Sequence, residues 1–216
     1  MTAPLIQKVA PPALPLGTET YQRPYQDQLN NVHRIFYNRL TNAFNAILGT
    51  NGGQYIDCPN GLFFNTADQT FAAINTAYPV VYNATYLSNA VQLRSGSTSQ
   101  IEVLVGGVYN FQYTGQVLSS SSSAKTIDLW IRRNGTDVPY SNRARTVTSN
   151  GQYTPVAWSF DIDLAVGEYI ELVAAVTDVN LFLDATVPTA PHPGTPSSVM
   201  TVNFIAPLPN PRPALP

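Results

Sequence analysis

The sequence predicts a mainly β protein, in which a two-sheet antiparallel sandwich follows an extended arm and one helix. Three observations support this prediction: apolar and polar residues alternate from residue 101 onward, an apolar repeat of helical spacing occurs near the start, and prolines gather at both ends. Alternation with a period of two is typical of strands that bury one face. Several short strands of this kind indicate a sandwich.

The first two elements are an arm and a helix. Residues 1–24 are expected to be extended, because their prolines prevent a regular helix. Residues 25–49 are expected to be a helix whose apolar side chains recur every three or four residues and so share one face: Leu29, Val32, Phe36, Leu40, Ala43 and Ile47. A solitary helix of this length is marginal in water. This face therefore packs either on the following domain or against copies of itself.

Residues 50–206 are expected to form the sandwich, with a turn-rich portion before residue 101. Asn134-Gly135 and Val166-Gly167-Glu168 have the composition of turns between strands. Residues 207–216 are rich in proline and form a second extended arm. The apolar residues that share strand faces are Ile101, Val103, Val105, Tyr109, Phe111, Tyr113, Val117, Ile127, Leu129, Ile131, Trp158, Phe160, Ile162, Leu164, Ile170, Leu172, Ala174, Val176, Leu181, Leu183, Met200, Val202 and Phe204.

Charge is scarce along the whole chain. Only 11% of the 216 residues are charged, against roughly 25% in an average soluble domain. The net charge of −2 and the ordinary apolar share of 44% argue against disorder. With two lysines, the chain offers no basic stripe to capture nucleic acid. No apolar run reaches the 18 residues of a membrane span, so membrane insertion is not expected.

No catalytic pattern is found, and we expect no enzyme, cofactor or metal. The single Cys58 excludes a disulfide framework, and His33 and His192 lie far apart in the sequence. The best carboxylate pair is Asp161 and Asp163, which share a strand face away from Trp158 and Phe160. Such a pair could bind a cation or act as acid and base, but a solvated strand face is the simpler interpretation.

Aromatic residues are numerous, with 12 Tyr, 9 Phe and 2 Trp. Alternation places Trp130 on an outward face with Asp128 and Arg132, and Tyr169 with Glu171. Outward aromatics can be sugar-stacking platforms, centres of a protein interface, or isolated surface residues. Because interface centres lose charge and gain aromatics, the charge-poor composition favours an interface between subunits, for which the candidates are Trp130, Tyr109, Tyr113 and Tyr169.

Residues 98–206 resemble the C1q/TNF-like jelly roll. Gly107-Val-Tyr109-Asn-Phe111 is similar to the G-x-Y-x-F strand of that family, and Asn134-Gly135 to its hairpin. Leu164-Ala-Val-Gly167-Glu168-Tyr-Ile170-Glu-Leu172 is similar to L-x-x-G-D-x-V-x-L, with Glu in place of Asp. The closing F-x-G motif of the animal proteins is absent. The proline-rich arm, the helix and the stretch from Gly61 to Val80 instead resemble bacteriophage virion proteins that carry this fold.

This resemblance implies a homotrimer that binds rather than catalyses. The implied protein is a structural component of a tailed-phage virion, assembled in the host cytoplasm, whose arm and helix attach to other virion proteins of the capsid or tail. Capsid decoration (a cement protein) or a head fibre is the leading hypothesis. A tail-fibre protein that binds a host surface glycan is the alternative. Two further classes stay open, a secreted C1q-like binding module and a polysaccharide-degrading spike.

Overall fold

The computed structural model describes residues 12–14, 19–48 and 58–209. The chain divides into two units, Met1–Asp57 with the helix and Cys58–Pro216 with the strands. The described parts of the two arms, residues 12–14, 19–22 and 207–209, contain no helix or strand. The rest of both expected arms lies outside the described residues.

The expected helix is confirmed as α1 (Arg23–Leu48). It begins two residues earlier than expected, because Pro24 is tolerated in a first turn, where its missing N–H has no helical partner. Arg23 Nε lies 3.8 Å from Asp27 Oδ2, one turn away. Residue 49, the last of the expected helix, lies outside the described residues. No helix in the described ranges is long and apolar enough to cross a membrane.

The second unit contains two seven-stranded sheets. All strand pairs in them are antiparallel. Sheet A consists of β1 (Asn60–Asn65), β2 (Gln69–Thr70), β4 (Ala84–Asn89), β7 (Gly107–Ser119), β11 (Tyr153–Leu164), β13 (Leu181–Leu183) and β14 (Ser198–Ala206). Sheet B consists of β3 (Tyr78–Pro79), β5 (Val91–Leu93), β6 (Ile101–Val103), β8 (Lys125–Arg133), β9 (Thr136–Asp137), β10 (Arg143–Val147) and β12 (Tyr169–Val176).

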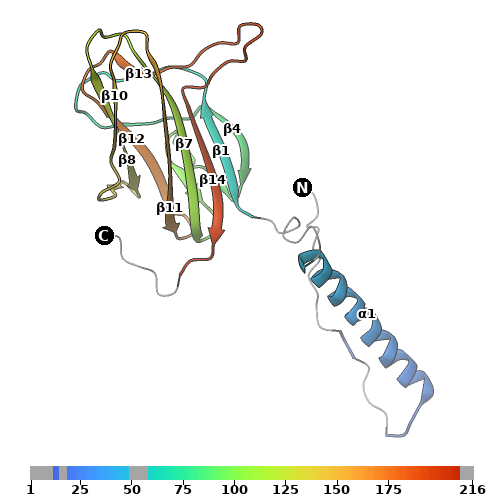
Figure 1. Ribbon diagram of the computed structural model, residues 1–216. Helices are drawn as coiled ribbons and strands as arrows, with labels where there is room; N and C mark the ends of the chain where they lie inside the picture. The colour runs from blue at the N-terminus through green and yellow to red at the C-terminus, as the bar shows by residue number, and fades with distance from the viewer. Residues whose placement is uncertain (1–11, 15–18, 49–57, 210–216) are drawn as a thin grey trace. The chain divides into compact units, whose positions relative to one another are not determined.

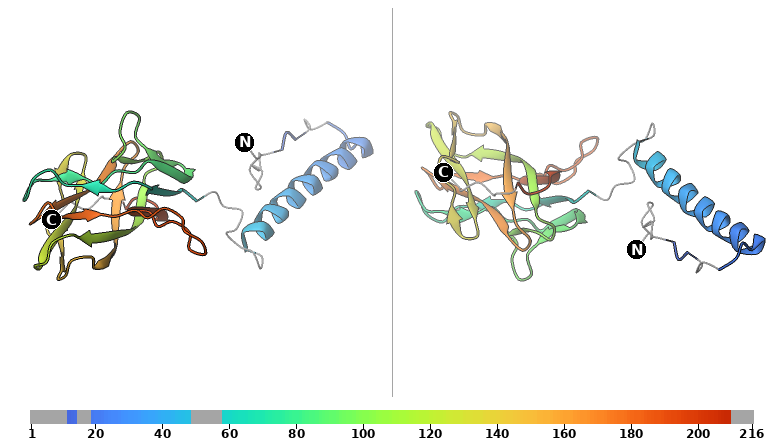
Figure 2. Two further views of the ribbon diagram at one scale, coloured as in Figure 1. Left: turned by 90° about the horizontal axis from the view of Figure 1, so that it is seen from above. Right: turned by 90° about the horizontal axis from the view of Figure 1, so that it is seen from below.

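The longest strand, β7, organises sheet A (Figure 1). It pairs with β11 along one edge and with β14 and β13 along the other, and β14 is followed by β1 and β4. In sheet B the order is β10, β8, β12, β6, β5. β11 and β10 are thus edge strands, each paired with one neighbour. The loop between β13 and β14 projects from the sandwich in all views (Figures 1 and 2; Figure 2 shows it from above and below).

The core lies between the two sheets, as expected for a sandwich. Most of the apolar side chains expected to share strand faces are buried there, in one cluster. Val105 is an exception, with 44% of its surface exposed, because β6 ends two residues before it. Trp158 and Phe160 are only half-buried, because they face inward from the edge strand β11.

Both expected turns are present. Asn134 and Gly135 have positive φ angles of 47° and 83° and connect β8 to β9. Gly167, with φ of 80°, lies in the turn from β11 to β12. The next residue, Glu168, accepts a hydrogen bond from the Ala165 backbone N–H (2.7 Å) and pairs with Arg133 Nη2 (2.6 Å). The turn is therefore tied to the end of β8.

Candidate functional site

The outer face of sheet A has no charged side chain on its three central strands. We call this surface the uncharged face. Its register is fixed by the pairs Thr114–Val199 and Gln112–Thr201, whose members point away from the buried Tyr113 and Met200. The uncharged face consists of Leu62 and Phe64 from β1, Val199, Thr201 and Asn203 from β14, and Val108, Asn110, Gln112, Thr114, Gln116 and Leu118 from β7.

The neighbouring edge strand extends this surface. Pro155, Ala157 and Ser159 of β11 pair with Gln116, Thr114 and Gln112 and are all exposed. On β11, charge appears at Asp161 and Asp163, and a further carboxylate borders the face after β13, where Asp184 Oδ2 accepts a hydrogen bond from Gln116 Nε2 (3.2 Å). The uncharged surface thus spans four adjacent strands.

The outer face of sheet B is different, because charges occur along its strands. Asp128 and Arg132 lie on β8, Glu102 on β6 and Glu171 on β12. Glu171 is buried and accepts a hydrogen bond from Ser99 Oγ (2.8 Å). The scarcity of charge is therefore not uniform over the sandwich: it is concentrated on one face. Charge depletion of this kind marks the centre of protein interfaces.

Asp161 and Asp163 share the outer side of β11, as predicted, and Trp158 and Phe160 lie on the inner side. Each carboxylate has a different partner. Asp161 Oδ1 accepts a hydrogen bond from Asn110 Nδ2 (2.6 Å), whereas Asp163 Oδ1 lies 3.6 Å from Arg133 Nη1. The two side chains are thus engaged in separate structural contacts. In the described part of the chain, no group of three His, Cys, Asp or Glu side chains could hold a metal ion.

Two of the four aromatic interface candidates require a correction. Tyr109 and Tyr113 are 0% and 1% exposed, because they point from β7 into the core of their own chain. Tyr109 donates a hydrogen bond to the Val105 carbonyl (2.6 Å), while the Tyr113 hydroxyl has no hydrogen-bond partner among the described residues. Burial raises the pKa of both phenols. Neither side chain can form the surface of a contact between subunits.

The other two candidates, Trp130 and Tyr169, lie half-buried on sheet B. Trp130 Nε1 donates to Asp137 Oδ1 (2.9 Å), and this bond is the main cause that lowers the pKa of Asp137. The guanidinium of Arg94 lies 4.8 Å from the centre of the Tyr169 ring. Both aromatics thus have partners within the chain, and their role in an interface stays a prediction.

The apolar face of α1 is the second candidate surface. Leu29, Val32, Phe36 and Leu40 are half-buried, and Ile47 is 38% exposed. None of these five side chains is fully buried. The helix therefore presents an apolar stripe of the kind that a partner covers in other proteins.

Neither a protein-family profile nor a curated protein sequence matches this chain.

The sequence candidates missed the residues of the uncharged face. Their signal was present in the sequence: Asn110, Gln112, Thr114 and Gln116 alternate with the core residues of β7. A solvent-facing strand usually places charges at such positions, and here there are none.

Proposed function

We propose that this chain is a structural protein of a tailed-phage virion, a trimeric surface knob most consistent with capsid decoration or a head fibre. The observation that carries the proposal is the uncharged face on sheet A. In this proposal three copies turn that face toward a common axis and bury it. The arm and the helix α1 attach the knob to the particle.

The order of strands supports the jelly-roll part of the proposal. With β2, β3, β4, β5, β9 and β13 left aside, eight sandwich strands remain, in chain order β1, β6, β7, β8, β10, β11, β12 and β14. The first, third, sixth and eighth belong to sheet A and the others to sheet B. A jelly roll consists of eight strands wound between two sheets in this way. The C1q/TNF-like motifs in residues 98–206 point to the same fold.

The chemistry of the uncharged face supports burial between copies. Leu62 and Phe64 supply apolar area, and amides and hydroxyls such as Gln112 and Thr201 can form hydrogen bonds across an interface. Burying an unpaired charge is costly, whereas a neutral polar group requires only a hydrogen-bond partner. A face without charge can thus be desolvated at lower cost than the outer face of sheet B.

The helix supports attachment or self-association. Its apolar stripe, from Leu29 to Ile47, is long enough to pack on another virion protein or on two other copies of α1. Each arrangement would remove the stripe from water. In the proposal, this unit holds the sandwich on the particle.

Adding the protein back to virions that lack it tests the decoration role. We expect the purified chain to bind such particles and raise the temperature at which they release DNA. A chain lacking residues 1–48 is the control, which should form the sandwich but leave the release temperature unchanged. Full-length protein that gives no rise in release temperature contradicts the decoration role.

The projecting loop between β13 and β14 favours the alternative, a tail-fibre protein that binds a host surface. Val187 in this loop is 80% exposed, and Thr186 and Thr195 form a backbone bridge at its base. Exposed loops on a rigid scaffold often carry binding residues. A pull-down on host cells tests this alternative, since a receptor-binding loop would retain the protein and a shortened loop would not.

A further inference from the structure

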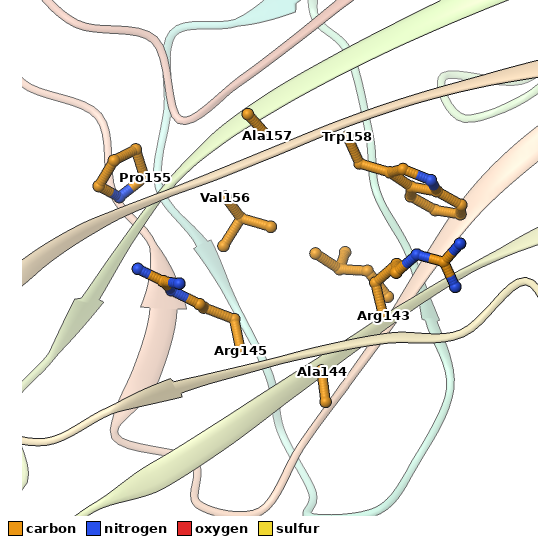
Figure 3. A pocket seen from close by; sticks show the side chains of 8 residues that line it. Arg143, Ala144, Arg145, Pro155, Val156, Ala157 and Trp158 are labelled. Atoms are coloured by element: carbon orange, nitrogen blue, oxygen red, sulfur yellow. The ribbon is translucent and has the colours of Figure 1, made fainter.

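A cleft opens between the two sheets at the edge of the sandwich, between β10 and β11 (Figure 3). Its volume is about 410 Å³, within the range of small-ligand sites, roughly 300–1,000 Å³. The register explains its position. Arg143 and Arg145 pair with Leu129 and Ile127 of β8, so their side chains share the core side of sheet B. Val156 and Trp158 face them from sheet A.

All polar side chains that line the cleft are hydrogen-bond donors. They are the guanidinium groups of Arg143 and Arg145 and the indole N–H of Trp158, and none of the three accepts a hydrogen bond. The other lining residues are apolar: Leu129 and Val156 turn their side chains toward the cleft, and Ala144, Pro155 and Ala157 belong to the strands that border it. A cleft of this composition is complementary to a ligand with negatively charged oxygens and an apolar surface.

The two arginines have no ion pair in the described part of the chain. Lys125, Arg132 and Arg133, by contrast, each lie within 4 Å of a carboxylate oxygen. Arg143 lies over the Trp158 ring at 5.5 Å and donates a hydrogen bond to the Asn142 carbonyl (2.9 Å). Figure 3 shows the guanidinium groups of Arg143 and Arg145 pointing toward opposite ends of the cleft, and two cationic groups without a carboxylate partner favour a bound anion.

The surrounding charges limit the kind of anion. Asp128 pairs with Ala144 and so lies on the outer side of sheet B, away from the cleft. Between residues 146 and 211 the chain has six acidic residues and no Lys or Arg. The net charge of −2 on the whole chain disfavours a polyanion such as nucleic acid. The ligand should carry one or two charges on a small body.

The strand edges add hydroxyl-binding capacity. Among the described strands, β10 pairs with β8 alone and β11 with β7 alone, so each borders the cleft with a backbone edge that none of these strands covers. Backbone N–H and C=O groups at such an edge can bind hydroxyls. An aromatic ring and apolar side chains also suit the C–H surface of a sugar ring.

We propose that this cleft binds a carboxylated sugar unit, with Arg143 and Arg145 donating hydrogen bonds to its oxygens from opposite ends of the cleft and Trp158 forming one wall. Guanidinium groups bind carboxylates through charge-assisted, often bidentate hydrogen bonds. The site lies within a single chain, so the inference goes beyond the proposed virion role and does not rest on it.

Titration calorimetry on the full chain tests the site, with glucuronate, glucose and benzoate as ligands. We expect glucuronate to bind and glucose, which lacks the carboxylate, to bind at least about tenfold more weakly. Benzoate tests whether the cleft binds a carboxylate on an aromatic ring in place of a sugar ring. If benzoate binds and glucuronate does not, the sugar assignment is overturned.

Two variants and a control locate the binding. Arg145→Gln and Arg143→Gln should each weaken glucuronate binding about tenfold or more. Arg132→Gln, on the outer face of the same sheet, should change it less than twofold. A melting curve for each variant verifies that it is folded. Absence of glucuronate binding at millimolar concentration, or equal binding by Arg145→Gln and the unmodified chain, overturns the proposal.

Discussion

At the scale of single residues, the core accepts Tyr113 only because residue 115 is glycine. The Tyr113 side chain lies over Gly115, and a Cβ built at residue 115 would overlap the Tyr113 hydroxyl. That hydroxyl is buried and has no hydrogen-bond partner within the part of the chain that the structure describes. The pair is a steric fit in which the ring occupies the space that a larger residue 115 would fill.

We predict that Gly115→Ala lowers the free energy of unfolding by about 1–3 kcal/mol, because the Tyr113 ring must shift in a packed core. Urea denaturation followed by circular dichroism measures this change. Tyr113→Phe is the matched control. It should be neutral or stabilising by about 1 kcal/mol, since it removes an unpartnered polar group. Gly115→Ala should also lower the free energy of unfolding by less in the Tyr113→Phe variant than in the unmodified chain. An equal loss in the two proteins would contradict the steric explanation.

Asp184 makes the stability of the fold depend on pH with a sign opposite to that of a carboxylate whose pKa is lowered by folding. Burial raises its pKa and the nearby Asp68 carboxylate adds to the rise, against a hydrogen bond from Gln116 that lowers it. The folded state then binds the proton more tightly than the unfolded state. The stabilisation from protonated Asp184 is complete below the unfolded pKa and is lost as the pH rises through the folded pKa.

We therefore predict that Asp184→Asn raises the melting temperature at pH 7 and that this gain disappears in acid. Asp137→Asn is the control of opposite sign. The Trp130 hydrogen bond lowers the pKa of Asp137, so its stabilisation is present above the unfolded pKa and is lost as the pH falls through the folded pKa. Asp137→Asn should lower the melting temperature at pH 7. Melting curves from pH 3 to pH 7 test both, and changes of the same sign would contradict this assignment.

At the scale of elements, alternation predicted the strands that bury one face and missed those that do not. β7 and β8 follow the expected pattern over their whole lengths. β4 and β10 were missed, because their side chains are mostly exposed on both sides and give no period of two. The cleft beside β10 could not be predicted for the same reason, since it depends on which strand forms the edge of sheet B.

The turn between β11 and β12 is an element whose residues act together. Glu168 accepts hydrogen bonds from Asn134 Nδ2 (2.9 Å), the Ala165 N–H (2.7 Å) and Arg133. Arg133 is only 8% exposed, so its charge depends on this carboxylate and on Asp163.

We predict that Glu168→Gln destabilises the sandwich by about 1–3 kcal/mol, the range for hydrogen bonds to charged groups, because it leaves Arg133 with one carboxylate. Chemical denaturation of the variant measures this loss. Glu102→Gln is the control. The Glu102 carboxylate on β6 accepts a hydrogen bond from Gln92 Nε2 (3.2 Å), and its replacement should lower the free energy of unfolding by less. Equal stability of Glu168→Gln and the unmodified chain would show that the turn does not depend on this charge.

At the scale of the whole molecule, the scarcity of charged side chains is most pronounced on the outer face of sheet A. The sequence alone placed the expected interface on aromatics, two of which, Tyr109 and Tyr113, belong to the core. Aromatic content cannot separate core from interface, because both environments favour large apolar rings. Only the pairing of β7 with β14 and β11 brings the uncharged side chains of different strands together.

We predict that a charge on the uncharged face disrupts association between copies. Gln112→Lys together with Thr201→Lys should convert the assembly to single chains without lowering the melting temperature of the sandwich, because both side chains point away from the core. Val187→Lys, on the projecting loop, is the control and should leave the assembly intact. An unchanged assembly in the double variant would remove the uncharged face from the proposed interface.

The mass of the chain in solution shows whether three copies associate. Light scattering on the purified full-length protein should give three times the 23.5 kDa of one chain, about 70 kDa. A mass of 23.5 kDa at the same concentration would contradict the trimer. It would also leave the uncharged face of sheet A exposed to water, without a second copy to cover it.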